Sequence, residues 1–149
     1  MQKRPIVLVE DNPNDIELTL RALERNGIAN KIIVAQDGEE ALDLLCSCGN
    51  PGAELSTAPQ LILLDLKLPK VDGVDILKRI RTEERLRGVP VVMLTSSQEE
   101  QDLLKCYASG ANSYIRKPVD FAAFVDAIRQ IGMYWLLLNE VSQPVEVSA

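Results

Sequence analysis

An α/β fold built on a parallel sheet is the class that the sequence predicts, and two patterns predict it. Stretches with the 3.6-residue spacing of amphipathic helices follow each of five short apolar runs. Strands that alternate with helices favour a parallel sheet covered on both faces, a doubly wound sandwich. The run Leu61-Ile62-Leu63-Leu64 is typical of a strand that is buried on both sides. The five runs lie at residues 5–9, 31–35, 60–64, 89–94 and 113–115.

The helices are predicted from their apolar faces and from the residues at their ends. The first spans residues 13–26, with Asn12 as its cap, Pro13 as its first residue and Gly27 after its end. The second helix begins after Asp37-Gly38, and the fifth begins near Asp120. The third spans residues 74–86 and the fourth spans residues 99–108. The inward residues of all five helices, in chain order, are Ile16, Leu20 and Leu23; Ala41, Leu42, Leu44 and Leu45; Ile76, Leu77 and Ile80; Leu103, Leu104 and Tyr107; and Phe121, Phe124, Val125, Ile128 and Ile131.

The length of 149 residues fits one domain. We expect a short lead at residues 1–4 and a domain at 5–131, interrupted by a long loop at 47–59 that is rich in glycine and proline. Residues 132–141 form an aromatic and apolar extension of the last helix. The tail at 142–149 is expected to be disordered.

Composition excludes several classes of function. A net charge of −6 argues against a nucleic-acid partner, and the longest apolar run, residues 133–138, is too short to span a membrane. With no secretory signal, we expect a cytoplasmic protein. The chain has no histidine, which excludes Ser-His-Asp and Cys-His nucleophiles. Three cysteines, Cys46, Cys48 and Cys106, are expected to be semi-buried thiols, since Cys46-x-Cys48 lacks a second pair to complete a zinc site.

Charged or hydroxyl residues follow four of the five runs. Ligands of open α/β sheets bind beyond the carboxyl ends of the strands, so these residues are candidates for one site. Carboxylates that converge there repel one another unless a cation compensates, and Mg²⁺ is the expected ion. A carboxylate of this kind can attack a phosphoryl group whose oxygens are bound by the ion, a lysine and a hydroxyl. In chain order the residues are Glu10 and Asp11, Asp65, Thr95 and Ser96, and Lys117 before Pro118.

Together these residues resemble the receiver domain of two-component response regulators. The resemblance covers about residues 5–131 and implies a flavodoxin-like fold with strand order 2-1-3-4-5. It rests on Glu10-Asp11 after Ile6-Val7-Leu8-Val9, Leu63-Leu64-Asp65, Leu68-Pro69 with Asp72-Gly73, Thr95-Ser96, and Lys117-Pro118.

The resemblance implies a role for each site residue. Asp65 is the phosphoryl acceptor and, with Asp11, a direct Mg²⁺ ligand, while Glu10 binds the ion through water and Lys67 through its backbone carbonyl. Thr95 and Lys117 contact the phosphoryl group. Apart from the resemblance, the side chain of Lys67, two residues past the acceptor, can either reach the phosphoryl group or shield it from attacking water, and either would tune the lifetime of that group. Tyr114 holds the position of an aromatic switch residue that moves with Thr95.

The long loop and the C-terminal aromatic segment resemble regulators paired with phytochrome-type histidine kinases, which often dimerise. The resemblance therefore implies a histidine kinase partner and a homodimer, and it leaves the downstream protein target open. The surface for the second copy is an apolar patch formed by Tyr134, Trp135, Leu137 and Leu138.

Each residue also has a simpler interpretation. Glu10 and Asp11 can cap the first helix, Thr95 can be an ordinary strand hydroxyl and Lys117 a surface cation. Tyr114 can be a packed aromatic residue. The segment around Trp135 can pack on its own domain.

Four classes of function remain in view. A receiver that docks on other proteins, and catalyses at most its own phosphorylation and dephosphorylation, is favoured. An enzyme of the aspartyl-phosphate type has a second aspartate two residues after the nucleophile, where this chain has Lys67. A nucleotide or flavin binder lacks its glycine-rich loop. A purely structural adaptor leaves the acidic residues unexplained.

Overall fold

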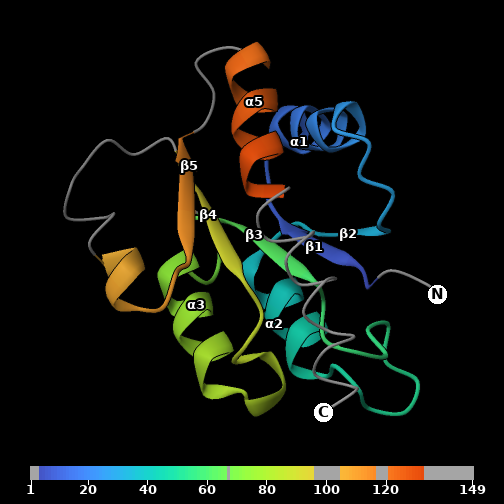
Figure 1. Ribbon diagram of the computed structural model, residues 1–149. Helices are drawn as coiled ribbons and strands as arrows, with labels where there is room; N and C mark the ends of the chain where they lie inside the picture. The colour runs from blue at the N-terminus through green and yellow to red at the C-terminus, as the bar shows by residue number, and fades with distance from the viewer. Residues whose placement is uncertain (1–3, 67, 96–104, 117–120, 133–149) are drawn as a thin grey trace, which may run out of the picture.

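The computed structural model describes residues 4–66, 68–95, 105–116 and 121–132. In these ranges strands and helices alternate along the chain (Figure 1). The strands are β1 (Ile6–Val9), β2 (Ile32–Ala35), β3 (Leu61–Asp65), β4 (Val91–Thr95) and β5 (Ser113–Arg116). The helices are α1 (Pro13–Arg25), α2 (Gly38–Cys46), α3 (Gly73–Thr82), the 3₁₀ helix η1 (Glu84–Leu86) and α5 (Phe121–Gly132).

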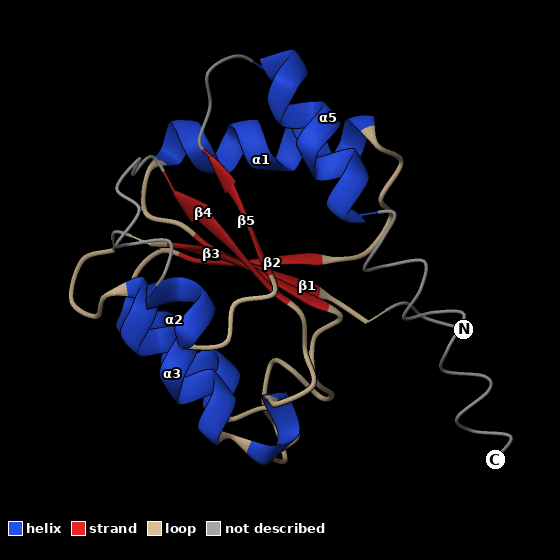
Figure 2. Cartoon of the chain, turned by 60° about the vertical axis from the view of Figure 1, so that its left-hand side comes forward, coloured by secondary structure: helices blue, strands red, loops and turns tan. Residues whose placement is uncertain are grey.

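The five strands form one parallel sheet in the order β2-β1-β3-β4-β5. Helices α1 and α5 cover one face of this sheet, and α2 and α3 cover the other (Figures 1 and 2). Alternate residues of β3 serve the two layers: Leu61 and Leu63 pack with α1 and α5, and Ile62 and Leu64 pack with α2 and α3. The fold class and strand order expected from the sequence are therefore confirmed.

Local signals explain how α1 begins and ends. The Asn12 side chain accepts hydrogen bonds from the backbone N–H groups of Asn14 and Asp15, at 2.9 and 3.2 Å, and so caps the helix ahead of Pro13. Gly27 follows the end of the helix with φ +70°. The helix buries Leu23, with Ile16 and Leu20 partly buried beside it, as its spacing predicts.

The third helix is shorter than the sequence predicts. Instead of continuing to residue 86, α3 ends at Thr82, Glu83 is extended, and a separate 3₁₀ turn follows. This turn directs Leu86 into the core at 1% exposure. Arg81 gives the physical reason, because its guanidinium donates to the carbonyls of Leu86 and Val89 and holds the returning chain against the helix end.

A prediction for the fourth helix was wrong at one position. The described part of this helix is a turn at residues 105–108, where Cys106 is buried at 1% and Tyr107 is 48% exposed. The inward-facing residue of this turn is therefore Cys106, one position before the predicted Tyr107. The predicted Leu103 and Leu104 lie outside the described residues. All three cysteines are thiols, but Cys48 is buried as well, so only Cys46 is semi-buried as expected.

The loop after α2 contains no helix or strand between described residues 47 and 60, yet it is packed against the domain. Leu55 is 1% exposed and belongs to the core, and its carbonyl accepts the backbone N–H of Gly49 at 2.8 Å. Arg85 of η1 donates to the carbonyl of Cys48 and to the side chain of Asn50. Across the described ranges of the chain, no helix is long and apolar enough to cross a membrane.

Candidate functional site

Two neighbouring strands bring acidic residues to one edge of the sheet. Glu10 and Asp11 directly follow β1, and Asp65 is the last residue of β3. The register pairs Val9 with Leu64, so Glu10 and Asp65 are the next residues along the two strands. A parallel arrangement places both strand ends at the same edge, which is why residues 55 positions apart in the chain meet there.

The three carboxylates converge. One side-chain oxygen from each of Glu10, Asp11 and Asp65 lies within 4.8 Å of the others. Glu10 is fully buried, Asp65 is 5% exposed and Asp11 is exposed. Negative charges this close repel one another, and burial of two of them adds a desolvation penalty. The arrangement suits a hard divalent cation, which prefers carboxylate oxygens and can keep water on its open side.

Backbone N–H groups hold the buried carboxylate in place. Oε2 of Glu10 accepts from the backbone N–H of Asp11 at 3.1 Å and of Asn12 at 3.3 Å. Its own backbone N–H donates to the carbonyl of Ala35 at 2.9 Å, which ties the residue to β2. The side chain that caps α1 is that of Asn12, so hydrogen-bond capping of this helix does not require the acidic pair.

The chain after Asp65 turns back against the strand end. Leu66 donates its N–H to the carbonyl of Leu94 at 3.0 Å, and Gly73 donates to the carbonyl of Leu66 at 3.0 Å. A Cβ on Gly73 would lie 2.3 Å from the carbonyl oxygen of Asp65. Glycine is therefore required at this point, and α3 begins in direct contact with the acidic site.

The other predicted site residues are only partly described. Thr95 ends β4, next to the pairing of Asp65 with Leu94, but its side chain lies outside the described residues. Lys67 and Lys117 lie outside them too, as do all of Tyr134, Trp135, Leu137 and Leu138. Tyr114 is described: it is half-buried on β5 and makes an edge-to-face contact with Tyr107, with the ring centroids 5.8 Å apart.

Comparison with known protein families shows which family has a site of this kind at this edge of the sheet. Residues 6–129 match the family described as the response regulator receiver domain. The chain belongs to this family. Receiver domains are signalling proteins, so the chain is not an enzyme of the aspartyl-phosphate type. The predicted membership of a two-component system is confirmed.

Two curated proteins and two solved structures are similar to this chain over most of its length. The receiver is 42% identical to the probable methanogenesis regulatory protein FilR2 of Methanothrix harundinacea, over 93% of this chain and 88% of that protein. It is 36% identical to the response regulator Rcp1 of Synechocystis, over 88% of each. The bacteriophytochrome response regulator RtBRR is 51% identical, with TM-score 0.75, over 90% of this chain and 81% of that one. The phosphorylated cyanobacterial phytochrome response regulator RcpA is 36% identical, with TM-score 0.79, over 90% and 94%.

Metal ions are named in two further solved structures, one of Rcp1 and one of another receiver domain. Rcp1 was crystallised in a Mn²⁺-bound form. That structure is 33% identical to this receiver, with TM-score 0.78, over 89% of this receiver and 94% of that chain. The receiver domain of the sensor histidine kinase PA1611 from Pseudomonas aeruginosa has a magnesium ion in its active-site cleft, at 28% identity and TM-score 0.69 over 89% and 97%. The acidic cluster of this receiver provides the carboxylates that such an ion needs.

Proposed function

We propose that this receiver accepts a phosphoryl group on Asp65 from the phosphohistidine of a partner histidine kinase, in a Mg²⁺-dependent reaction, and signals by docking onto another protein. One observation carries the proposal: Asp65 is buried, at 5% exposure, within 4.8 Å of the carboxylates of Glu10 and Asp11. A buried carboxylate among like charges is electrostatically unfavourable if its role is only structural. Beside a bound cation, the same carboxylate is well placed to act as a nucleophile.

The proposed ligands of the ion are Asp11 and Asp65 directly, Glu10 through water, and the backbone carbonyl of Lys67. Bound Mg²⁺ would neutralise the charge on the phosphoryl oxygens. The two backbone N–H groups that Glu10 accepts support its role, because they fix the carboxylate before any ion binds. Lys67 enters as a proposal from the family resemblance, since it lies outside the described residues.

The chain's own residues perform the transfer. An oxygen of Asp65 attacks phosphorus while the bond from phosphorus to the donor nitrogen breaks, and the imidazole, already protonated on its other ring nitrogen, leaves as a neutral group that keeps the electron pair of the broken bond. We assign the hydroxyl of Thr95 and the ammonium group of Lys117 to the phosphoryl oxygens, and the Lys67 side chain to the lifetime of the product. The register supports Thr95, because Asp65 pairs with Leu94 and Thr95 is the next residue along β4.

Tyr114 is proposed as the switch residue that follows Thr95. Its half-buried position on β5 and its contact with the exposed Tyr107 support the assignment, because the ring lies at the boundary between core and surface. A small charge change at Asp65 would then alter the surface that other proteins contact.

A phytochrome-type histidine kinase is the proposed donor. RtBRR and RcpA, which resemble this receiver over 90% of its length, are both described as phytochrome response regulators. Docking onto another protein is the proposed output because the receiver matches 88% of the length of FilR2 and of Rcp1. Little of either relative is then left for a separate output domain.

We also propose that residues 132–141 extend α5 as an apolar segment that pairs two copies of the chain, with a disordered tail at 142–149. The sequence supports this pairing surface through Tyr134, Trp135, Leu137 and Leu138, which lie outside the described residues. Light scattering of wild type and of a Trp135→Ala, Leu137→Ala double variant tests it. Dimeric wild type and monomeric variant are expected, and equal monomer masses would remove the proposal.

Acetyl phosphate tests the phosphorylation itself. After incubation with Mg²⁺ and this small phosphodonor, intact-mass measurement should show one added phosphoryl group on wild type and none on Asp65→Asn. Asp43→Asn, which changes an exposed aspartate of α2, is the matched control and should label like wild type. An unlabelled wild type, or a labelled Asp65→Asn variant, would contradict the proposal. Steady turnover of many phosphate esters would instead indicate an enzyme.

A further inference from the structure

The loop that joins β3 to α3 begins directly after Asp65 and returns to it. Its ends are closed by the hydrogen bond from the N–H of Gly73 to the carbonyl of Leu66, at 3.0 Å. Gly73 also packs against the Asp65 backbone so closely that a side chain would not fit. Both ends of this loop therefore contact the strand end that carries Asp65.

The tip of this loop has a strained backbone. Val71 donates its N–H to the carbonyl of Pro69 at 2.8 Å, which makes Lys70 the central residue of a three-residue turn. Lys70 has φ +69°, and it is the one residue other than glycine with a positive φ in the parts of the chain that the structure describes. Turns of this hand are rare and strained. A non-glycine residue keeps such a conformation only where its surroundings hold it.

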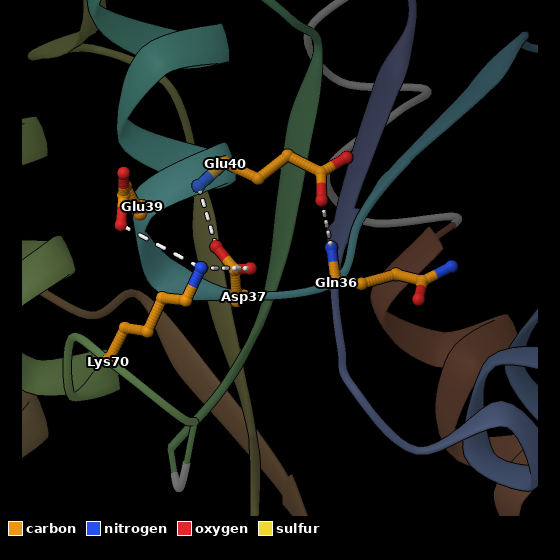
Figure 3. Close-up of polar contacts among 5 residues, drawn as sticks. All are labelled: Gln36, Asp37, Glu39, Glu40 and Lys70. Atoms are coloured by element: carbon orange, nitrogen blue, oxygen red, sulfur yellow. Dashed lines mark hydrogen bonds and ion pairs between the residues drawn. The ribbon is translucent and has the colours of Figure 1, made fainter.

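The first turn of α2 provides those surroundings. Nζ of Lys70 lies 3.3 Å from Oδ2 of Asp37 and 3.8 Å from Oε2 of Glu39 (Figure 3). Asp37 is itself fixed, because its Oδ1 accepts the backbone N–H of Glu40 at 2.8 Å and so caps α2. The ammonium group thus joins the loop tip to a rigid helix start.

The two backbones are also pressed together beside this ion pair. A Cβ on Gly38, the first residue of α2, would lie 2.5 Å from Cβ of Val71 and 2.6 Å from its carbonyl oxygen. The N–H of Gly38 points at the carbonyl of Pro69, at 3.5 Å. The contact between α2 and the loop is therefore a docked surface, with the ion pair of Lys70 at its rim.

The ion pair is charged over the neutral pH range. The backbone N–H of Glu40, followed by Lys70, holds the pKa of Asp37 below its ordinary value. The hydrogen bond to Asp37 raises the pKa of Lys70. The Lys70 side chain is exposed and that of Asp37 is partly exposed, at 57% and 23%, so the pair acts by holding a geometry and contributes little to the free energy of unfolding.

We propose that Lys70 is a positioning residue for the phosphorylation site, because its ammonium group, held by Asp37 and Glu39, fixes the tip of the loop that begins directly after Asp65. The inference rests on the proposed function, since Mg²⁺ binding and phosphoryl transfer at Asp65 are what the loop position serves. In this proposal Lys70 acts through the loop and does not contact the phosphoryl group.

Electrostatics alone makes the opposite prediction, and this separates the two explanations. A lysine on the loop that follows Asp65 repels a divalent cation at the acidic site, so its removal should tighten Mg²⁺ binding if the charge acts only at long range. If Lys70 positions the loop, its removal should weaken Mg²⁺ binding. Lys78→Met is the matched control, because it removes the same charge from an exposed site on α3.

The test measures the Mg²⁺ dissociation constant by titration calorimetry, and the rate of labelling by acetyl phosphate, on the full chain. For Lys70→Met we expect binding about two- to fivefold weaker than wild type, the range that loss of an exposed ion pair supports. Lys70→Arg should restore it, because it keeps the charge. A purely structural role would lower the melting temperature of the metal-free protein and leave the Mg²⁺ dissociation constant unchanged.

A double-variant cycle identifies the partner. Asp37→Asn keeps an acceptor for the N–H of Glu40, so the cap of α2 is retained while the charge is lost. In that background Lys70→Met should no longer weaken Mg²⁺ binding. Weakening of the same size in both backgrounds would show that Lys70 does not act through Asp37.

The two proposals can fail separately. If wild type binds Mg²⁺ and is labelled, while Lys70→Met binds Mg²⁺ as tightly as Lys78→Met, the positioning role is overturned and the proposed function stands. If wild type neither binds Mg²⁺ nor is labelled, the proposed function itself is overturned.

Discussion

Nη2 of Arg81 donates to Oδ1 of Asn112 at 2.8 Å, and the same oxygen accepts the backbone N–H of Val91 at 2.8 Å. Arg81 also donates through Nε to the carbonyl of Gly110 at 2.9 Å, and through Nη1 to the carbonyls of Leu86, Arg87 and Val89. Its partners are neutral, and burial lowers the pKa of the guanidinium. One side chain thus joins the end of α3, the start of β4 and the turn before β5.

Arg81→Met should lower the free energy of unfolding by about 2–3 kcal/mol, because part-buried carbonyls lose their donor. Arg81→Lys should recover only part of this loss, since an ammonium group cannot reach acceptors on three segments at once. Urea denaturation gives the measurement. The control is Arg79→Met, whose exposed ion pair with Glu83 at 3.2 Å should be worth less than about 1 kcal/mol. Equal losses in the two variants would show that the network has no special weight.

Gly73→Ala should destabilise the domain by about 2–3 kcal/mol, because the new Cβ would lie 2.3 Å from the carbonyl oxygen of Asp65 and neither backbone can yield easily. Gly88→Ala is the matched control. A Cβ at that position meets nothing within 4 Å, so the variant should stay within about 0.5 kcal/mol of wild type or gain slightly. Chemical denaturation of both variants compares them directly, and a tolerated Gly73→Ala would contradict the close approach.

Asp11→Ala should raise the melting temperature of the metal-free protein, because it removes one of three mutually repelling carboxylates. Added Mg²⁺ should stabilise wild type, by about 2.7 kcal/mol at a hundred times its dissociation constant, and hardly affect the variant. Asp43→Ala should respond to Mg²⁺ as wild type does. Thermal denaturation with and without the ion checks this, and equal responses of wild type and Asp11→Ala would exclude Asp11 as a ligand.

The stability of the domain should fall above about pH 8.5 through Cys48. Burial raises the pKa of this thiol, so the folded protein keeps a proton that the unfolded chain releases near its ordinary value of about 8.5. The contribution is fully present below that pH and is lost as the pH rises through the folded value. Urea denaturation between pH 7 and 10 should show a shallower decline for Cys48→Ala than for Cys46→Ala, whose thiol is only half-buried. Parallel declines would remove Cys48 as the cause.

Sequence periodicity was sufficient where local order and parallel topology act together. Glu10 and Asp65 could be placed at one site from the sequence, because each follows an apolar run and parallel strands end at the same edge of the sheet. The positions of Thr95 and Tyr114 on their strands follow from the same logic. These predictions needed no knowledge of side-chain packing.

Contacts between distant segments could not be predicted in this way. Leu55 lies in a stretch rich in glycine and proline, and nothing local shows that the loop turns its one leucine into the core. The end of α3 at Thr82 depends on carbonyls that Arg81 meets only after the chain has turned back. Cys106 and Tyr107 are adjacent, and a shift of one residue in the helical face exchanges their burial. At Lys70 the usual signal for a positive φ, glycine, is missing.

The fit of Gly38 against Val71 has a consequence for recombination among receiver domains. Because the missing Cβ would meet the backbone of Val71 as well as its side chain, a smaller residue at position 71 would not make room for one at 38. The start of α2 and the loop after Asp65 are therefore a single module, although more than thirty residues of chain separate them. A chimera with one crossover inside residues 38–71 would take the start of α2 from one parent and the loop after Asp65 from the other, so their backbones would not be complementary. Crossovers placed before 38 and after 73 would transfer the module whole.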